Sequence, residues 1–344
     1  MHQKLETYVA KDLRILQEKH DVRECEFIGV KNTRPSRLLR DVFVLIQGVW
    51  WSDLTVSWFG KLHGFFTVFF SKMLGKKSIV VSGGDDVANY PTTNGSYGLC
   101  ADPVKKWFAY LTFKFCDAII CISKFNLEET IRNAKANPRK IKLIYHGFDG
   151  GAFCRLPSIE KEAMVITIGN VDRENYYRKG LKLFTETARL LPDLPLFLIG
   201  PKFGPEGDDT FDLLRKIASP NITLTEGLYG DDLVKLLSKA SVYVQASEWE
   251  SFGCSVAEAM LCECVPVVSR NTALPEVVGD AGFYLDELSP QELAIKIREA
   301  LRHPEFGKLA RKRILDNFPL AKRKDDLLQV VESVAMDKGS PYAP

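Results

Sequence analysis

A chain of 344 residues is long enough for about two domains of ordinary size, each with its own hydrophobic core. Apolar residues make up 46% and charged residues 26% of the chain, which is typical of a folded protein and excludes a disordered one. The net charge of +2 gives no general electrostatic attraction to nucleic acid.

The cysteines and the apolar stretches indicate the cellular compartment of the protein. The eight cysteines form no Cys-x-x-Cys pair and no Cys/His spacing suited to a metal, which predicts free thiols. Residues 1–13 lack the apolar core of a signal peptide, and no stretch has the ~18 uncharged apolar residues of a membrane span. We expect a cytoplasmic protein with the inner face of the membrane as a peripheral site.

Short apolar runs alternate with segments of helical periodicity in the first half, a pattern typical of βα units and a parallel sheet. The opening residues 5–18 have a helical pattern. The expected strands are 54–58, 78–82, 118–123 and 141–147, and the expected helices are 36–50, 61–74 and 104–114.

Segment 149–161 contains Gly150, Gly151 and Pro157 and interrupts the pattern, which predicts a domain boundary. The α/β pattern then resumes, and beyond Pro290 the chain is helical. The expected strands are 164–169, 194–200, 222–227, 242–247 and 265–269, and the helices are 181–191, 209–218, 231–239 and 255–261. We therefore predict domains of residues 1–150 and 151–320, and a C-terminal helix and tail of residues 321–344 that packs on the first domain.

Several catalytic motifs are absent from the sequence. It contains no GxGxxG, no GxxxxGK[ST], no HExxH and no Asp-x-Asp pair. These absences exclude the usual dehydrogenase, P-loop and zinc-protease sites, and the common glycosyltransferase site that holds a divalent metal through two aspartates.

Residues 247–258, SEWESFGCSVAE, lie between an expected strand and an expected helix. Gly253 allows close backbone approach, and the N–H groups of Cys254, Ser255 and Val256 at the helix start suit a diphosphate. Glu258 can accept hydrogen bonds from ribose hydroxyls, and Glu250 from hydroxyls of a transferred sugar. Each feature has a structural alternative, because acidic residues are favoured near helix starts and Phe252 can be a core residue.

Residues 247–285, SEWESFGCSVAEAMLCECVPVVSRNTALPEVVGDAGFYL, resemble the hallmark segment of family 4 glycosyltransferases, including the E-x7-E pair at Glu250 and Glu258. The similarity extends over roughly residues 36–335 and is most specific in the second half. The resemblance implies an α/β GT-B fold, in which two Rossmann-like domains face each other across a cleft. The second domain would hold a nucleotide sugar and the first an acceptor.

The resemblance also implies a retaining reaction without a metal or other cofactor, with the leaving diphosphate helping as base. Lys179, before Gly180, matches the family's Lys-Gly motif, whereas the family's usual Arg after the first strand is Asn170 here. The catalytic residues would be Glu250, Lys179 and Asp86. The donor-binding residues would be Arg173, Arg178, Gly200, Phe252, Gly253, Cys254, Ser255 and Glu258.

The first domain departs further from the family. Many relatives have His-Gly after a strand where this chain has Gly83-Gly84-Asp85-Asp86. Gly83, Gly84, Asp85 and His63 are the expected acceptor-side residues, with Asp86 orienting a hydroxyl and a plain turn as the alternative. His146, where the family usually has Asn, is expected to be structural.

The expected partners are a nucleotide-sugar donor and a glycan or lipid-linked acceptor, without nucleic acid. The aromatic residues at 50, 51, 58, 59, 65, 66, 69 and 70, with Lys61, Lys72, Lys76 and Lys77, predict peripheral membrane contact or, alternatively, core packing. The alternative functions are a GT-B epimerase or phosphorylase, and a catalytically silent nucleotide-sugar-binding or scaffold protein.

Overall fold

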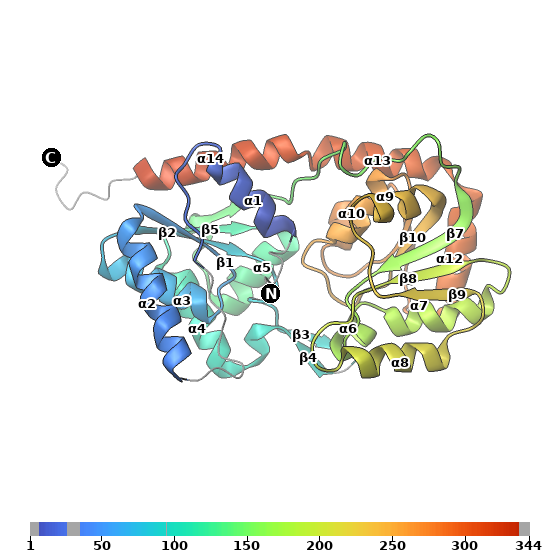
Figure 1. Cartoon of the computed structure of the whole chain (residues 1–344), viewed down its shortest axis with the longest axis horizontal. Coiled ribbons are helices and arrows are strands. Elements are labelled where there is room, and N and C mark those ends of the chain that lie inside the picture. The colour runs from blue at the N-terminus through green and yellow to red at the C-terminus, as the bar shows by residue number, and fades with distance from the viewer. Residues whose placement is uncertain (1–6, 26–34, 94, 337–344) are drawn as a thin grey trace. The chain divides into compact units, whose positions relative to one another are not determined.

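The computed structural model describes residues 7–25, 35–93 and 95–336 (Figure 1). Its contacts divide the chain into two compact units. The first unit comprises the residues up to Tyr90, Ser96–Gly147 and the residues from Ala321 onward, and the second comprises Pro91–Gly95 and Phe148–Leu320. The predictions for residues 1–6 and for the tail after residue 336 lie outside the described residues.

The first unit contains a parallel sheet of four strands in the order β1-β2-β5-β6. Its strands are β1 (Leu54–Trp58), β2 (Lys77–Ser82), β5 (Ala118–Cys121) and β6 (Ile141–Leu143), with a separate ribbon of β3 (Tyr90–Thr92) and β4 (Gly95–Tyr97). Its helices are α1 (Thr7–Gln17), α2 (Pro35–Trp51), α3 (Leu62–Met73), α4 (Pro103–Phe115), α5 (Lys124–Ala134) and α14 (Leu320–Met336), with short helices η1 (Leu99–Ala101) and η2 (Pro138–Lys140).

Local sequence explains where these helices begin. The Asp102 carboxylate accepts hydrogen bonds from the backbone N–H groups of Val104 and Lys105, and Pro103 occupies the first turn of α4. The Ser123 hydroxyl accepts the N–H of Asn126 at the start of α5. Between these helices β5 is completely buried, so its apolar residues form the centre of the first core.

A buried ion pair joins two helices of the first unit that are far apart in sequence. Arg323 of α14 donates Nε and Nη2 to the two oxygens of Asp12 in α1, at 2.7 and 2.6 Å. Its Nη1 donates to the carbonyl oxygens of Ile144 and Tyr145. These carbonyls are thus bound by a side chain, and β6 ends at Leu143, whereas the sequence predicted a strand to residue 147.

The second unit contains a parallel sheet of six strands in the order β12-β11-β10-β7-β8-β9. The strands are β7 (Glu162–Ile168), β8 (Leu196–Ile199), β9 (Ile222–Thr225), β10 (Ala240–Gln245), β11 (Val265–Ser269) and β12 (Phe283–Leu285). The helices are α6 (Arg173–Arg178), α7 (Leu181–Thr187), η3 (Ala188–Leu190), α8 (Gly207–Ile217), α9 (Gly230–Lys239), α10 (Cys254–Leu261), α11 (Leu274–Val278), α12 (Pro290–Arg302) and α13 (Glu305–Asn317).

The strand order of this second sheet reverses between β7 and β10. From β7 the chain moves outward to β8 and β9, and from β10 it moves outward to β11 and β12 on the other side. The loops that follow β7 and β10 therefore leave the same edge of the sheet at the reversal. In open α/β sheets this is the usual position of a ligand.

The structure confirms the predicted strand and helix types of both sheets and adds elements that the sequence analysis missed. The missed elements are α6, α11, β3, β4 and β12. Among the described residues no strand precedes β1, and no described helix is long and apolar enough to cross a membrane. The eight cysteines are free thiols, as predicted.

Candidate functional site

The loops after β7 and β10 bring the predicted donor-side residues together. The loop after β7 leads into α6 and ends at Lys179, and the loop after β10 carries residues 246–253 into α10. The two segments approach so closely that a Cβ atom on Gly180, which has φ of +70°, would lie 2.3 Å from the carbonyl oxygen of Ala246. Glycine at position 180 is therefore required by the contact between these loops.

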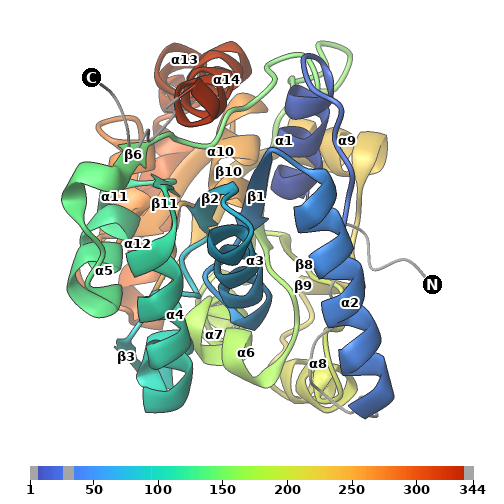
Figure 2. The same ribbon diagram turned by 90° about the vertical axis from the view of Figure 1, so that its left-hand side faces the viewer.

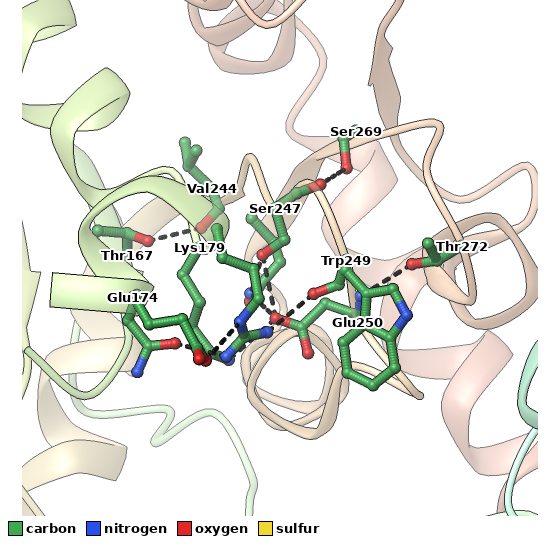
Figure 3. Close-up of polar contacts among 12 residues, drawn as sticks. Thr167, Glu174, Lys179, Val244, Ser247, Trp249, Glu250, Ser269 and Thr272 are labelled. Carbon is green, nitrogen blue, oxygen red and sulfur yellow. Dashed lines mark hydrogen bonds and ion pairs between the residues drawn. The ribbon is translucent and has the colours of Figure 1, made fainter. Parts of the chain in front are cut away.

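A buried carboxylate, that of Glu250, lies at the centre of this arrangement. Its Oε1 accepts hydrogen bonds from Lys179 Nζ at 2.9 Å, Gln245 Nε2 at 2.9 Å and Ser247 Oγ at 3.0 Å. Figure 3 shows the side chains of Lys179 and Ser247 directed at this carboxylate. Within the described part of the chain Oε2 accepts no hydrogen bond, so that oxygen can accept one from a ligand.

The charges around Glu250 keep it ionised. Burial of this residue, which is 7% exposed, would by itself raise the pKa of its carboxyl group, but the cations of Lys179 and Arg178 outweigh burial and lower that pKa below its ordinary value. Glu250 is thus a buried anion that is paired with a cation, and it can accept but not donate hydrogen bonds at neutral pH.

The orientation of Glu250 depends on residues that the sequence analysis did not identify. Tyr243 Oη donates to Gln245 Oε1 at 2.7 Å, which turns the amide N–H of Gln245 toward Glu250. The backbone N–H of Glu250 donates to Thr272 Oγ1 at 2.9 Å. The only signal in the sequence was the polar pair Gln245 and Ser247 at the end of an otherwise apolar strand.

Arg178 occupies a position inside the second unit. Its Nη1 donates to the carbonyl oxygen of Trp249 at 2.9 Å and its Nη2 to Asn175 Oδ1 at 2.5 Å, while its own carbonyl oxygen accepts the N–H of Glu248. The buried guanidinium thus joins the two loops on either side of Glu250, and its predicted contact with the donor stays a prediction. Arg173, by contrast, is exposed at the start of α6.

The start of α10 combines a special backbone with an open cap. Gly253 has φ of +105°, and a Cβ atom there would lie 2.9 Å from Leu274 Cδ2, so glycine is required. As the N-cap residue it offers no side-chain acceptor to the first-turn N–H groups. Cys254, Ser255 and Glu258 are half-buried on this helix, and Gly200 lies at the end of β8, where a Cβ atom would meet the carbonyl oxygen of Gly169 at 2.1 Å.

Phe252 does not have the predicted donor-binding position. Its ring is 1% exposed and contacts Phe148 and Phe318, with ring centroids 5.8 and 5.4 Å away. The structural alternative is therefore correct, because Phe252 is a core residue that holds the loop between Glu250 and Gly253 against the rest of the second unit.

In the first unit, Asp86 is completely buried, which gives it a structural position, and its predicted catalytic role stays a prediction. Its carboxylate accepts hydrogen bonds from the N–H groups of Gly60 at 2.6 Å and Gly84 at 2.9 Å, and from Ser82 Oγ at 3.3 Å. Burial, together with neighbouring Asp85, raises the pKa of Asp86 to about 6. Asp86 thus fixes the loops after β1 and β2 to each other.

The other predicted acceptor-side residues lie around these loops. Lys61 Nζ pairs with Asp85 at 2.6 Å, and His63 Nε2 donates to the carbonyl oxygen of Trp58 at 2.6 Å. Burial lowers the pKa of His63. A Cβ atom on Gly83 would lie 2.0 Å from the ring of Phe59, whose own φ of +71° is unusual for a side chain of that size.

Two further predictions concern His146 and metal ions. His146 is buried, its ring stacks on Trp58 at 6.1 Å, and burial lowers its pKa well below the ordinary value. Among the described residues, no three His, Cys, Asp or Glu side chains converge in a group that could hold a metal ion.

The fold is that of GT-B glycosyltransferases. A crystal structure of HepE from Anabaena in complex with UDP and glucose superimposes with a TM-score of 0.75 at 16% identity, covering 93% of this chain and 89% of that one. A glycosyltransferase from Rickettsia africae superimposes with a TM-score of 0.71 at 14% identity, covering 91% and 85%. Residues 154–315, which make up most of the second unit, match the family described as Glycosyl transferases group 1.

Curated relatives match part of the chain. The N-acetylgalactosamine-N,N'-diacetylbacillosaminyl-diphospho-undecaprenol 4-alpha-N-acetylgalactosaminyltransferase of Campylobacter jejuni is 25% identical over 53% of this chain and 49% of its own length. One component of the human phosphatidylinositol N-acetylglucosaminyltransferase is 27% identical over 58% and 42%. The O-antigen chain mannosyltransferase B of Escherichia coli is 34% identical over 39% and 36%. The chain thus spans half or less of the length of these three relatives.

Proposed function

We propose that this protein is a glycosyltransferase that moves a sugar from a nucleotide-diphosphate sugar to a hydroxyl group of an acceptor. The observation that carries the proposal is the buried Glu250–Lys179 pair at the reversal of the second sheet, beside the open start of α10. The group 1 family of residues 154–315 supports the same chemistry.

The donor is expected to bind through complementary charges. The first-turn N–H groups of α10 and the positive end of its dipole suit a diphosphate. The ammonium of Lys179 has three N–H donors, and its hydrogen bond to Glu250 uses one of them, so the same group can also contact phosphate. Glu250 Oε2 then accepts a hydroxyl of the sugar, and Glu258 accepts the ribose hydroxyls.

The proposed reaction retains the configuration of the sugar and needs no metal. When the bond between sugar and diphosphate breaks, negative charge develops on the leaving group. Lys179 and the α10 N–H groups are preorganised to stabilise that charge, which is the task that a divalent ion performs in other transferases. The acceptor hydroxyl attacks from the face that the diphosphate leaves and passes its proton to that group.

The proposed acceptor is a glycan or a lipid-linked glycan, met at the cytoplasmic side of a membrane. The relative from Campylobacter jejuni is named for a diphospho-undecaprenol substrate, and the human relative for phosphatidylinositol. These names support a lipid-linked acceptor for this chain.

The test begins with a thermal-shift screen of UDP, GDP, ADP and dTDP sugars. A ligand at 100 times its dissociation constant adds about 2.7 kcal/mol to the free energy of unfolding, which is readily measured. With the donor identified, Glu258→Ala and Lys179→Ala are expected to reduce turnover by at least about a hundredfold, on the scale of losing one preorganised donor to the transition state. Lys182→Ala is the matched control, because Lys182 pairs with Glu186 on the surface of α7.

Three outcomes would contradict the proposal. Stabilisation by no nucleotide would favour the scaffold protein, and release of nucleotide diphosphate in the absence of acceptor would favour an epimerase. Unchanged donor kinetics in both variants would show that the donor does not bind at the assigned site.

A further inference from the structure

The outward face of α2 is apolar. Asp41, Leu45 and Val49, spaced by four residues, are buried against the first unit. The opposite face of the same helix carries exposed Leu39, Phe43, Val44 and Trp50, and the Trp50 side chain is 73% exposed. A helix on the surface of a water-soluble domain normally has a polar outward face, so α2 has the inverse arrangement.

The two neighbouring helices extend this surface. In the first unit α3 packs between α2 and α4, and Figure 2 shows the three helices side by side. The rings of Phe65 in α3 and Phe108 in α4 are in contact, with centroids 5.1 Å apart. The exposed apolar side chains of α3, its C-cap residue and α4 are Phe69, Met73, Leu74, Val104, Trp107 and Phe115.

The charges on the same three helices have one sign. Segments 35–51, 62–73 and 103–115 contain a single acidic residue, Asp41, which is 5% exposed on the inward side of α2. The basic side chains described on these helices are all at least partly exposed, and they are Arg40, Lys72, Lys105, Lys106 and Lys114. Two of these cations pair with acidic residues just outside the helices, Lys105 with Asp102 and Lys72 with Asp117. Large apolar groups and an excess of cations thus share one surface.

We propose that the α2–α3–α4 surface, defined by the exposed residues of these three helices, docks onto a bilayer that contains anionic lipids. The aromatic and aliphatic side chains enter the boundary between headgroups and acyl chains, and the basic side chains bind lipid phosphates. The inference goes beyond the proposed sugar transfer, because it rests on the surface of the first unit alone.

Charge decides between a bilayer and a second copy of this chain. In a symmetric dimer the surface would face itself, and Arg40, Lys106 and Lys114 would be brought together, whereas the adjacent Asp102 and Asp117 already pair with Lys105 and Lys72. An anionic bilayer satisfies both the apolar and the cationic side chains.

The experiment is flotation of the full chain with two kinds of vesicle, phosphatidylcholine alone and phosphatidylcholine mixed with phosphatidylglycerol. We expect binding to the mixed vesicles and weaker binding to the neutral ones. Arg40→Glu with Lys105→Glu should lower partitioning onto the mixed vesicles by at least about tenfold, because each basic residue near an anionic surface contributes about a kilocalorie per mole. Trp50→Ser with Trp107→Ser should lower partitioning onto both.

Matched controls come from the second unit. Ile295→Ser with Leu309→Ser removes exposed aliphatic groups, and Arg215→Glu with Lys312→Glu reverses exposed charges. Neither pair should change partitioning. All of the substituted side chains are exposed, and identical thermal unfolding of the variants confirms that they are folded.

A second readout tests insertion directly. Brominated acyl chains should quench tryptophan fluorescence of the wild type, and Trp50→Phe with Trp107→Phe should lose that quenching while still binding vesicles. The proposal is overturned if the wild type binds neither vesicle, or if it sediments as a dimer that the Trp50 and Trp107 substitutions dissociate. The proposal is also overturned if the surface variants, like the control variants, bind vesicles as well as the wild type does.

Discussion

Each unit buries a carboxylate at the carboxyl edge of its parallel sheet, and the neighbours of the two carboxylates differ in charge. Asp86 of the first unit accepts hydrogen bonds from two backbone N–H groups and a hydroxyl, and its nearest charged neighbour in sequence is another acid, Asp85. Glu250 of the second unit is bonded to a lysine. The pKa of Asp86 is consequently raised to about 6, whereas that of Glu250 is lowered.

The difference shows which kind of buried carboxylate is suited to bind a ligand. Neutral donors bind both carboxylate oxygens of Asp86 and hold two loops together. The cation beside Glu250 allows a carboxylate to stay ionised in the interior, and one of its oxygens accepts no hydrogen bond from the described residues. A buried acid is therefore better placed to bind substrate when a cation, and not the backbone alone, compensates its charge.

The largest expected effect comes from removing that cation. Lys179→Met leaves Glu250 buried without its ion-pair partner and should lower the free energy of unfolding by about 3–5 kcal/mol. Lys182→Met, which breaks the exposed pair with Glu186, should cost less than about 1 kcal/mol. Urea denaturation of both variants measures the difference, and equal losses would show that burial adds nothing to the Glu250–Lys179 pair.

The second effect is a pH dependence of opposite sign in the two units. The carboxyl group of Asp86 binds its proton more tightly in the folded chain than in the unfolded chain, where its pKa has the ordinary value of 3.8. The free energy of unfolding should therefore fall as pH rises from about 4 to about 6. The full fall is about 3 kcal/mol, since one pKa unit corresponds to about 1.4 kcal/mol. Glu250, with a lowered pKa, contributes stability that is lost only as pH falls below its ordinary value of 4.5.

Denaturation at a series of pH values checks this prediction. The asparagine in Asp86→Asn has no proton to lose. The free energy of unfolding of this variant should therefore lack the fall between about pH 4 and 6 that Asp86 causes in the wild type. Parallel curves for the two proteins would show that Asp86 does not carry a raised pKa.

The smallest effect tests whether the first-unit loops act on the donor site. Gly83→Ala places a methyl group 2.0 Å from the Phe59 ring and should cost about 2 kcal/mol by overpacking. Nucleotide affinity should not change, because the proposed donor residues belong to the second unit. In the background of Phe59→Gly, which removes the ring, the Gly83 substitution should become nearly neutral. A loss of nucleotide affinity in Gly83→Ala would show that this loop is coupled to the donor site.

Much of the fold was predictable from the sequence: the fold prediction is confirmed, and residues 154–315 match the predicted family. The alternation of short apolar runs with helical segments determines parallel α/β sheets. Lys179 and Glu250 were both identified as site residues, but their ion pair was not, since 71 positions separate them and each was assigned to a different part of the substrate.

The burial of Asp86 and Phe252, which the sequence did not predict, has a common physical origin in packing. Asp86 and Phe252 were assigned to chemistry because polar loops and aromatic residues occur at binding sites, but long-range neighbours decide whether a side chain is buried. For Asp86 that neighbour is Gly60, and for Phe252 it is Phe148. The direction of α2 was unpredictable for a related reason, because both of its faces carry apolar residues at helical spacing.

The buried pair of Arg323 with Asp12 has a consequence for biosynthesis. The first unit is discontinuous, since α14 is translated only after the whole of the second unit. A nascent chain therefore keeps Asp12 and the Ile144 and Tyr145 carbonyls without their arginine until the ribosome has passed residue 323. The second unit, apart from Pro91–Gly95, is a continuous segment that can mature earlier, so the amino-terminal unit is the last to be completed.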